Sequence, residues 1–127
     1  MPNPVTVLTV DDQAVFLRAA AKLIAACPGF ELIGEATSGP EALEFAAALR
    51  PDLVLLDVRM PGMDGVETAV RLTASDPQVA IVLISLEEIP ELPASLDGTK
   101  LATLRKQQLS PRTLSRVWAG HRLQHAR

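Results

Sequence analysis

Aromatic side chains are scarce in this sequence. It contains three Phe, one Trp and no Tyr, so that aromatic residues make up 3% of its 127 positions. Proteins that bind single-stranded nucleic acids commonly stack the bases on aromatic rings. A binding site of that kind is therefore not expected.

Cysteine and long apolar runs are almost absent as well. Cys27 is the only cysteine, so no disulfide can form within the chain and a reducing compartment is expected. We interpret Cys27 as a small buried residue near a helix end. No apolar run is long enough to cross a bilayer, and the first four residues lack the features of a signal peptide. These absences predict a cytoplasmic protein that makes no membrane contact.

Acidic residues are missing from the end of the chain. All 15 Asp and Glu lie before residue 98, whereas 7 of the 12 Lys and Arg lie after residue 97. Such a basic end can contact nucleic acid or an acidic partner. We interpret it as a solvated helix face that complements an acidic body, because no DNA-reading module is recognisable. Direct binding to nucleic acid is therefore not expected.

Apolar residues, at 48%, are abundant enough to form the core of a single domain over residues 1–127. Short apolar runs, typical of buried strands, lie at 5–10, 30–36, 53–56, 79–84 and 100–104. Helices are expected at 14–27, 38–49 and 65–75, and from Ser110 onwards. Within the first of these helices, at 14–27, Val15 and Phe16 belong to a set of apolar residues at helical spacing. Between the fourth and fifth strands a full helix is doubtful, because Pro90 and Pro93 interrupt the segment.

This alternation of strands and helices indicates an α/β fold with a parallel sheet covered on both faces. Three carboxylates follow predicted strands: Asp11 and Asp12 follow the first, and Asp57 follows the third. In a doubly wound sheet these strands are neighbours and ligands bind at their carboxyl ends. Because carboxylates packed together repel one another, a cation must offset them, and oxygen ligands favour Mg²⁺. Asp12 alone would be an ordinary helix cap, and Asp64 is interpreted only as a cap.

Two further polar residues occur at predicted strand ends. Ser85 ends the fourth strand and Lys106 follows the fifth. Alone, Ser85 would be interpreted as a turn residue and Lys106 as a solvated charge. Together with the acids they suit phosphoryl chemistry, in which cations neutralise phosphoryl oxygens, a hydroxyl donates a hydrogen bond and a carboxylate attacks phosphorus.

Three stretches of the sequence resemble the receiver domains of two-component response regulators. They are residues 10–13, 52–65 and 81–85. The second is highly specific, and the resemblance runs over residues 5 to about 118. It implies a flavodoxin-like five-stranded sheet in the order 2-1-3-4-5, flanked by five helices. The fourth helix is expected to be short or broken, because of Pro90 and Pro93.

The resemblance also implies roles for individual residues. Asp57 matches the phosphoacceptor, which also binds Mg²⁺. Asp12 matches a direct ligand of the ion, and Asp11 an acid that reaches it through water. The backbone carbonyl of Arg59 matches a further ligand.

The switch residues are implied by the same comparison. Ser85 matches the hydroxyl that moves toward the phosphoryl group, and Lys106 the lysine that pairs with that group. Arg59 and Glu87 flank the expected entrance, and we hypothesise that they form an ion pair.

The second half of the sequence departs from the family pattern. Leu86 stands where a very small residue is usual and should narrow access to Asp57. Thr103 replaces the aromatic switch residue, and Pro90 and Pro93 break the fourth helix. The surface that most receivers use for output is therefore altered, which leaves open whether these changes slow or abolish phospho-switching.

A receiver is not an enzyme beyond catalysing its own phosphorylation and dephosphorylation. The resemblance implies a sensor histidine kinase or phosphotransfer protein as donor, and a downstream protein or a C-terminal output domain outside this chain as target. The basic last helix, with Arg112, Arg116 and Arg122, offers one contact surface, and a homodimer is a further option.

Two alternatives remain. A pseudo-receiver would keep the fold and act as a protein-interaction module without phosphorylation. A phosphatase with an aspartate nucleophile would need an acid two positions beyond Asp57, where Arg59 stands.

Overall fold

A five-stranded parallel sheet forms the centre of the molecule, in the order β2-β1-β3-β4-β5. The computed structural model describes residues 3–125, and their side chains as far as residue 121. The strands are β1 (Val5–Val10), β2 (Phe30–Ala36), β3 (Leu53–Asp57), β4 (Ala80–Ser85) and β5 (Leu101–Arg105). Both the predicted strand positions and the predicted order are confirmed.

The pairing register aligns the carboxyl ends of the central strands at one edge. Val10, the last residue of β1, lies opposite Leu56 of β3. Asp57 then lies opposite Ile84, and Ser85 opposite Arg105. Polar residues at or just beyond these strand ends are therefore brought to one level.

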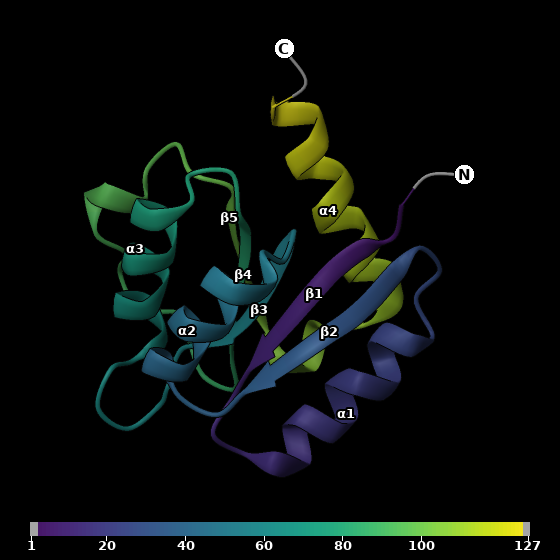
Figure 1. Ribbon diagram of the computed structural model, residues 1–127, viewed down its shortest axis with the longest axis horizontal. Helices are drawn as coiled ribbons and strands as arrows, with labels where there is room; N and C mark the ends of the chain where they lie inside the picture. Colours follow the sequence, from purple (N-terminus) through teal and green to yellow (C-terminus); the bar gives the residue numbers. More distant parts are fainter. Residues whose placement is uncertain (1–2, 126–127) are drawn as a thin grey trace.

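Four α-helices flank the sheet within the described residues. They are α1 (Ala14–Ala25), α2 (Gly39–Leu49), α3 (Gly65–Ser75) and α4 (Pro111–His125). Helices α1 and α4 pack on one face of the sheet, and α2 and α3 on the other (Figure 1). The described part of the chain has no helix that is long and apolar enough to span a membrane.

The fourth of the five expected helices is absent as an α-helix from the described chain. The crossover from β4 to β5 contains only a short 3₁₀ turn, η1 (Ala94–Leu96). Proline lacks the N–H that a helix interior requires, so Pro90 and Pro93 prevent a regular helix there. Leu96 still anchors the crossover, because its side chain is buried in the core beside α2 and α3. The prediction of a short or broken fourth helix is confirmed.

Serine side chains cap the first turns of α2 and α4. The Ser38 hydroxyl accepts the N–H of Glu41 at 3.2 Å, and the Ser110 hydroxyl accepts the N–H of Thr113 at 3.1 Å. These side chains satisfy N–H groups that have no partner within the helix. They thereby fix where α2 and α4 begin.

Cys27 lies in the core, whereas Val15 lies at the surface. Cys27 is 2% exposed, as expected, and packs with residues of α1 and α4. Val15, in contrast, is 69% exposed, whereas Leu17 is buried. Val15 lies in the first turn of α1, where it borders an open cavity beyond the edge of the sheet instead of the core.

Candidate functional site

Three carboxylates converge at the carboxyl edge of the sheet. Asp11, Asp12 and Asp57 each offer one oxygen, and these oxygens all lie within 4.8 Å of one another. Asp11 and Asp57 are buried, at 0% and 5% exposure, whereas Asp12 is exposed. The structure therefore brings together the three acids that the sequence predicted to meet.

A close backbone approach fixes the position of Asp57. The N–H of Gly65 donates to the carbonyl of Val58 at 2.8 Å, so that the start of α3 packs directly against the end of β3. A Cβ atom at position 65 would lie 2.1 Å from the backbone oxygen of Asp57. Only glycine fits there. The Asp64 side chain caps α3 by accepting the N–H of Glu67 at 2.8 Å, which confirms its interpretation as a cap.

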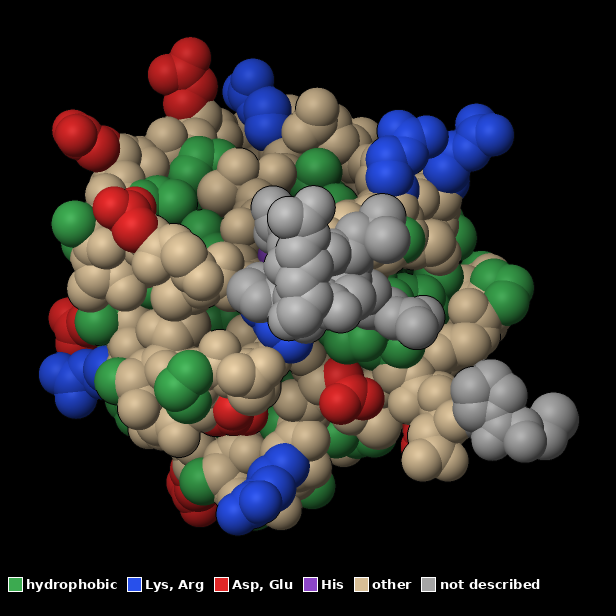
Figure 2. All heavy atoms as spheres, turned by 90° about the horizontal axis from the view of Figure 1, so that it is seen from above, with side chains coloured by type: hydrophobic (Ala, Val, Ile, Leu, Met, Phe, Trp, Pro, Cys, Tyr) green, Lys and Arg blue, Asp and Glu red, His purple; other side chains and the backbone are tan. Residues whose placement is uncertain are grey.

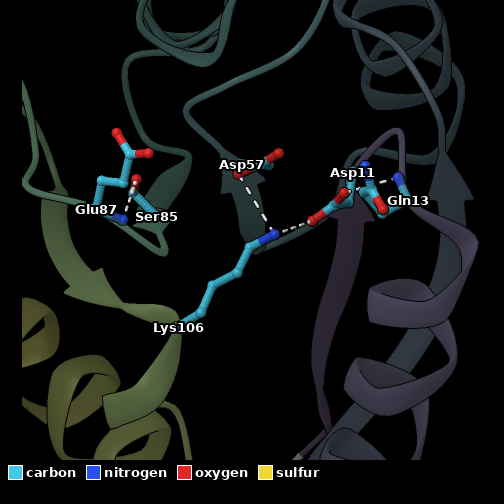
Figure 3. Close-up of polar contacts among 6 residues, drawn as sticks. All are labelled: Asp11, Gln13, Asp57, Ser85, Glu87 and Lys106. Atoms are coloured by element: carbon cyan, nitrogen blue, oxygen red, sulfur yellow. Dashed lines mark hydrogen bonds and ion pairs between the residues drawn. The ribbon is translucent and has the colours of Figure 1, made fainter.

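Asp11 is held by two different partners. Its Oδ1 accepts the backbone N–H of Gln13 at 2.8 Å, and its Oδ2 forms an ion pair with Nζ of Lys106 at 2.7 Å (Figure 3). The N-cap residue of α1 is Gln13, without a side-chain cap. Asp12 is therefore not the cap of α1. Its carboxylate faces the open cavity that Asp12, Asp57, Ser85 and Lys106 line.

Lys106 reaches across the sheet edge from the turn after β5 (Figure 3). Besides Asp11, its Nζ lies 3.6 Å from Oδ1 of Asp57. Its side chain is only 10% exposed, so these charges interact in an environment with little water to screen them. The prediction that Lys106 joins the acids is confirmed.

The pKa of Asp57 is raised from 3.8 to about 6. Burial is the main cause, because it disfavours the charged carboxylate. The negative charge of Asp11 raises the pKa further, and that of Asp12 adds a smaller contribution. The ammonium of Lys106 and a hydrogen bond from the backbone of Arg59 act in the opposite direction without cancelling these effects.

Ser85 is 1% exposed at the end of β4. Its hydroxyl oxygen accepts the backbone N–H of Glu87 at 3.2 Å, and Figure 3 shows it beside Glu87 on the far side of Asp57 from Asp11. Ser85, Asp57 and Lys106 nevertheless line the same cavity. The hydroxyl is thus within the site and tied to the loop that follows β4.

Leu86, Arg59 and Glu87 lie at the mouth of the cavity. Leu86 is 62% exposed and lines the cavity together with Asp57. Arg59 and Glu87 form an ion pair, with Nη2 and Oε2 3.0 Å apart and both side chains largely exposed. The hypothesis of this pair is confirmed. Thr103 is exposed on β5 and is absent from the cavity lining.

Phe16 belongs to the site, although the sequence did not indicate this. The ring of Phe16, on α1, lies with its centroid 4.2 Å from Nζ of Lys106. Periodicity indicated that Phe16 belongs to an apolar face, and it does pack partly against the core. Nothing in the sequence indicated that the lysine would lie over its ring.

The charges of the site suit a divalent cation. Three carboxylates face one ammonium within a few ångströms, so that full ionisation leaves two uncompensated negative charges. Oxygen donors at an open edge are the ligands of a hard ion. Asp11, Asp12 and Asp57 could therefore hold such an ion.

Among the described residues, the charged side chains at the opposite end of the molecule do not form a comparable cluster. Figure 2 views it from the amino ends of the strands, and charged side chains of both signs are scattered there among uncharged ones. The described basic residues of α4, Arg112 and Arg116, are exposed. The side chain of Arg122 lies outside the described residues.

Residues 7–113 match the family model described as the response regulator receiver domain. Among curated proteins, the chain is 34% identical over 112 residues to the nitrate/nitrite response regulator protein NarL of Escherichia coli K12. The match covers 84% of this chain and 52% of that protein. It is 36% identical over 92 residues to the response regulator GacA of Pseudomonas viridiflava, covering 72% of this chain and 43% of that protein. The chain thus spans about half the length of these relatives.

Solved structures show the same likeness. The signal receiver domain of NarL from Mycobacterium tuberculosis is 28% identical, with a TM-score of 0.78 and coverage of 99% of this chain and 100% of that one. The response regulator domain of Thermotoga maritima CheB is 25% identical, with a TM-score of 0.76 and coverage of 94% and 97%.

Proposed function

The chain belongs to the response regulator receiver family, and from this premise we propose that it is a phosphorylation switch with Asp57 as the phosphoacceptor. The observation that carries the proposal is the convergence of three carboxylates and one lysine at the carboxyl edge of the sheet. A receiver domain is a signalling module and not an enzyme, since it catalyses only its own phosphorylation and dephosphorylation.

The reaction follows from the position of Asp57. A carboxylate oxygen of Asp57 attacks the phosphorus of a phosphohistidine, the P–N bond breaks, and the imidazole keeps the electron pair of that bond. The product is an acyl phosphate on Asp57. Asp57 must be ionised to attack. A nearby cation would favour this ionised form, because it opposes the rise in the pKa of Asp57 that burial and the charge of Asp11 cause.

Mg²⁺ is the cation that we assign to the three acids. Asp12 and Asp57 would bind it directly, Asp11 through water, and the backbone carbonyl of Arg59 would complete the protein ligands. The ion would neutralise charge on the phosphoryl oxygens during transfer. The exposure of Asp12 supports this assignment, because its carboxylate is open to the cavity and has no partner among the described side chains.

Ser85 and Lys106 would bind the phosphoryl group once it has formed. The Lys106 ammonium is already 3.6 Å from Asp57 and would pair with a phosphoryl oxygen. The Ser85 hydroxyl would turn from the Glu87 N–H toward another oxygen. This movement of the Ser85 hydroxyl would carry the signal into the β4–β5 crossover. Thr103 has no aromatic ring that could change its position in response to phosphorylation.

The partners are proposed from the family. A sensor histidine kinase or a phosphotransfer protein would donate the phosphoryl group. A protein target, or an output domain like those of longer response regulators, would receive the signal. Residues 1–127 would form one receiver domain, and its cytoplasmic location remains a prediction.

A pseudo-receiver is the second candidate function. It is favoured by Thr103 in place of the switch ring and by a crossover that lacks an α-helix between β4 and β5. Such a protein would keep the fold and bind partners without phosphorylation.

Intact-mass spectrometry separates the two functions. The chain is incubated with Mg²⁺ and acetyl phosphate beside an Asp57→Ala control. A gain of one phosphoryl group that is lost in the control and in EDTA supports the switch. No gain, together with no binding of beryllofluoride, supports the pseudo-receiver.

A further inference from the structure

Three groups surround the ammonium of Lys106. Two are the carboxylates of Asp11 and Asp57, at 2.7 and 3.6 Å. The third is the ring of Phe16, whose centroid lies 4.2 Å from Nζ. Phe16 and Lys106 are far apart in the sequence and come from different elements, α1 and the turn after β5.

The ring attracts the ammonium electrostatically. An aromatic face carries partial negative charge, and a cation within about 6 Å of the ring centroid is bound by it, most strongly where water is excluded. The Lys106 side chain is 10% exposed, so little water competes. The ring thus offers the ammonium an attraction that involves no hydrogen bond and no formal charge.

A lysine needs such a constraint in order to act at one defined place. Its ammonium is a point charge on a flexible four-carbon stem, with three donors that can turn toward any acceptor. The shorter contact draws it toward Asp11, away from the oxygen of Asp57 where the phosphoryl group would form. The ring face adds a third contact to the two carboxylates, which limits the positions open to the ammonium.

We propose that Phe16 is a positioning residue for the phosphoryl reaction, and that its ring face holds the Lys106 ammonium where it can pair with a phosphoryl oxygen on Asp57. This inference rests on the proposed function, because the phosphoryl group is its purpose. In this proposal Phe16 acts through Lys106 and takes no direct part in the reaction.

Simple packing is the competing explanation. Phe16 lies partly in the core that α1 and α4 form on one face of the sheet, and leucine would fill much of that space. The two explanations predict different effects of the electron density of the ring, because a cation–π contact depends on that density and an apolar contact does not. A series of fluorinated phenylalanines at position 16 varies this property while the ring keeps its shape.

The first experiment tests the contact without any phosphorylation. In the NMR spectrum of the full chain, a ring above Nζ shifts the Lys106 ε-methylene protons upfield relative to those of the exposed Lys22. We expect this shift in the wild type and in Phe16→Tyr, and its loss in Phe16→Leu. Unshifted ε-methylene protons in the wild type would overturn the contact whatever the protein does with phosphate.

The second experiment tests the role. The rate of phosphorylation by acetyl phosphate at saturating Mg²⁺ is measured with zero to five fluorines on residue 16. The same series is placed at Phe45 of α2, which packs partly against the core on the other face of the sheet. We expect a stepwise fall at position 16, reaching about tenfold in total, which corresponds to a cation–π attraction of ordinary strength. At Phe45 the rate should stay constant.

Thermal unfolding midpoints distinguish a positioning effect from a folding defect. The position-16 series should unfold at similar temperatures, since the packing volume barely changes. A flat rate series in a folded protein would overturn the positioning role. If the wild type takes up no phosphoryl group, the proposed function fails and the positioning role fails with it, while the NMR shift still decides the contact.

Discussion

Lys106 is the only lysine or arginine that forms an ion pair with Asp11 within the described residues, at 2.7 Å. Asp11 is fully buried, and a buried charge without a partner is strongly destabilising. Lys106 therefore stabilises the folded protein relative to one in which Asp11 lacks a partner, besides belonging to the site.

Replacing Lys106 with methionine should show how strong this stabilisation is. Methionine keeps an apolar side chain of similar length and removes the charge, which leaves three carboxylates with no internal cation. We expect the free energy of unfolding at pH 7 to fall by about 3 kcal/mol, and Mg²⁺ to restore more stability in Lys106→Met than in the wild type. Urea unfolding with and without Mg²⁺ measures both. The exposed control Lys22→Met should change little, and an equal loss in both variants would contradict the prediction.

The raised pKa of Asp57 predicts how stability depends on pH. Between pH 3.8 and about 6 the folded protein keeps a proton on Asp57 that the unfolded chain has released. The folded state binds more protons in this window, so this group makes the protein less stable as the pH rises through it. Above pH 6 the penalty is complete, and a shift of this size corresponds to at most about 3 kcal/mol.

Asp57→Asn removes this penalty because the amide is neutral at every pH. The variant should therefore be more stable than the wild type at pH 7 and similar to it near pH 4. Mg²⁺ should narrow the gap at pH 7, since it favours the ionised wild-type site. Chemical unfolding at a series of pH values gives the comparison, with exposed Asp97→Asn as control. A difference between wild type and Asp57→Asn that is constant from pH 4 to pH 7 would count against a raised pKa.

Much of this site could be predicted from local sequence features. The apolar run of β3 ends at Asp57, and that of β1 ends just before Asp11. Because parallel strands bring their carboxyl ends to one edge, these two boundaries were enough to place both acids together. Pro90 and Pro93 likewise indicated the missing helix, since proline acts on the backbone directly.

Contacts that depend on side-chain direction were not accessible in this way. Helical spacing places Phe16 and Val15 on one apolar stretch, yet Val15 is 69% exposed, because the first turn of α1 extends past the sheet. The Phe16 contact with Lys106 depends on how two flexible side chains meet across the sheet edge. The hydrogen bond from Glu87 to Ser85 depends on the path of the loop after β4.

Leu86 should control access to Asp57. Its side chain is 62% exposed at the cavity mouth, so Leu86→Ala should change the free energy of unfolding by no more than about 0.5 kcal/mol. The wider entrance should speed both phosphorylation by acetyl phosphate and hydrolysis of the acyl phosphate. Loss of the phosphoryl group followed by intact mass gives the second rate. Leu49→Ala, also exposed but distant from the cavity, should leave both rates unchanged, and unchanged rates in Leu86→Ala would remove Leu86 as a barrier.

Two glycines should respond to alanine with opposite signs. A Cβ on Gly65 would overlap the backbone of Asp57 at 2.1 Å, so Gly65→Ala should lower the free energy of unfolding by more than about 3 kcal/mol and weaken Mg²⁺ binding. Gly120, inside α4, has no atom near its would-be Cβ, and Gly120→Ala should add about 0.5 to 1 kcal/mol through helix propensity. Urea unfolding of both variants tests the pair. A well-folded Gly65→Ala with unchanged Mg²⁺ affinity would mean that the close approach is not needed.

The Arg59–Glu87 ion pair should matter for kinetics more than for stability. Both side chains are largely exposed, so a double-mutant cycle with Arg59→Ala and Glu87→Ala should give a coupling energy of at most about 1 kcal/mol, and less at high salt. The pair closes part of the mouth, so each variant should lose the phosphoryl group faster than the wild type. The double variant should be no faster than the faster single variant, because either change alone opens the pair. The exposed control Arg71→Ala, whose partner Glu67 lies on α3, should hydrolyse at the wild-type rate. Additive effects of the two single changes on hydrolysis would show that Arg59 and Glu87 act separately on the entering water.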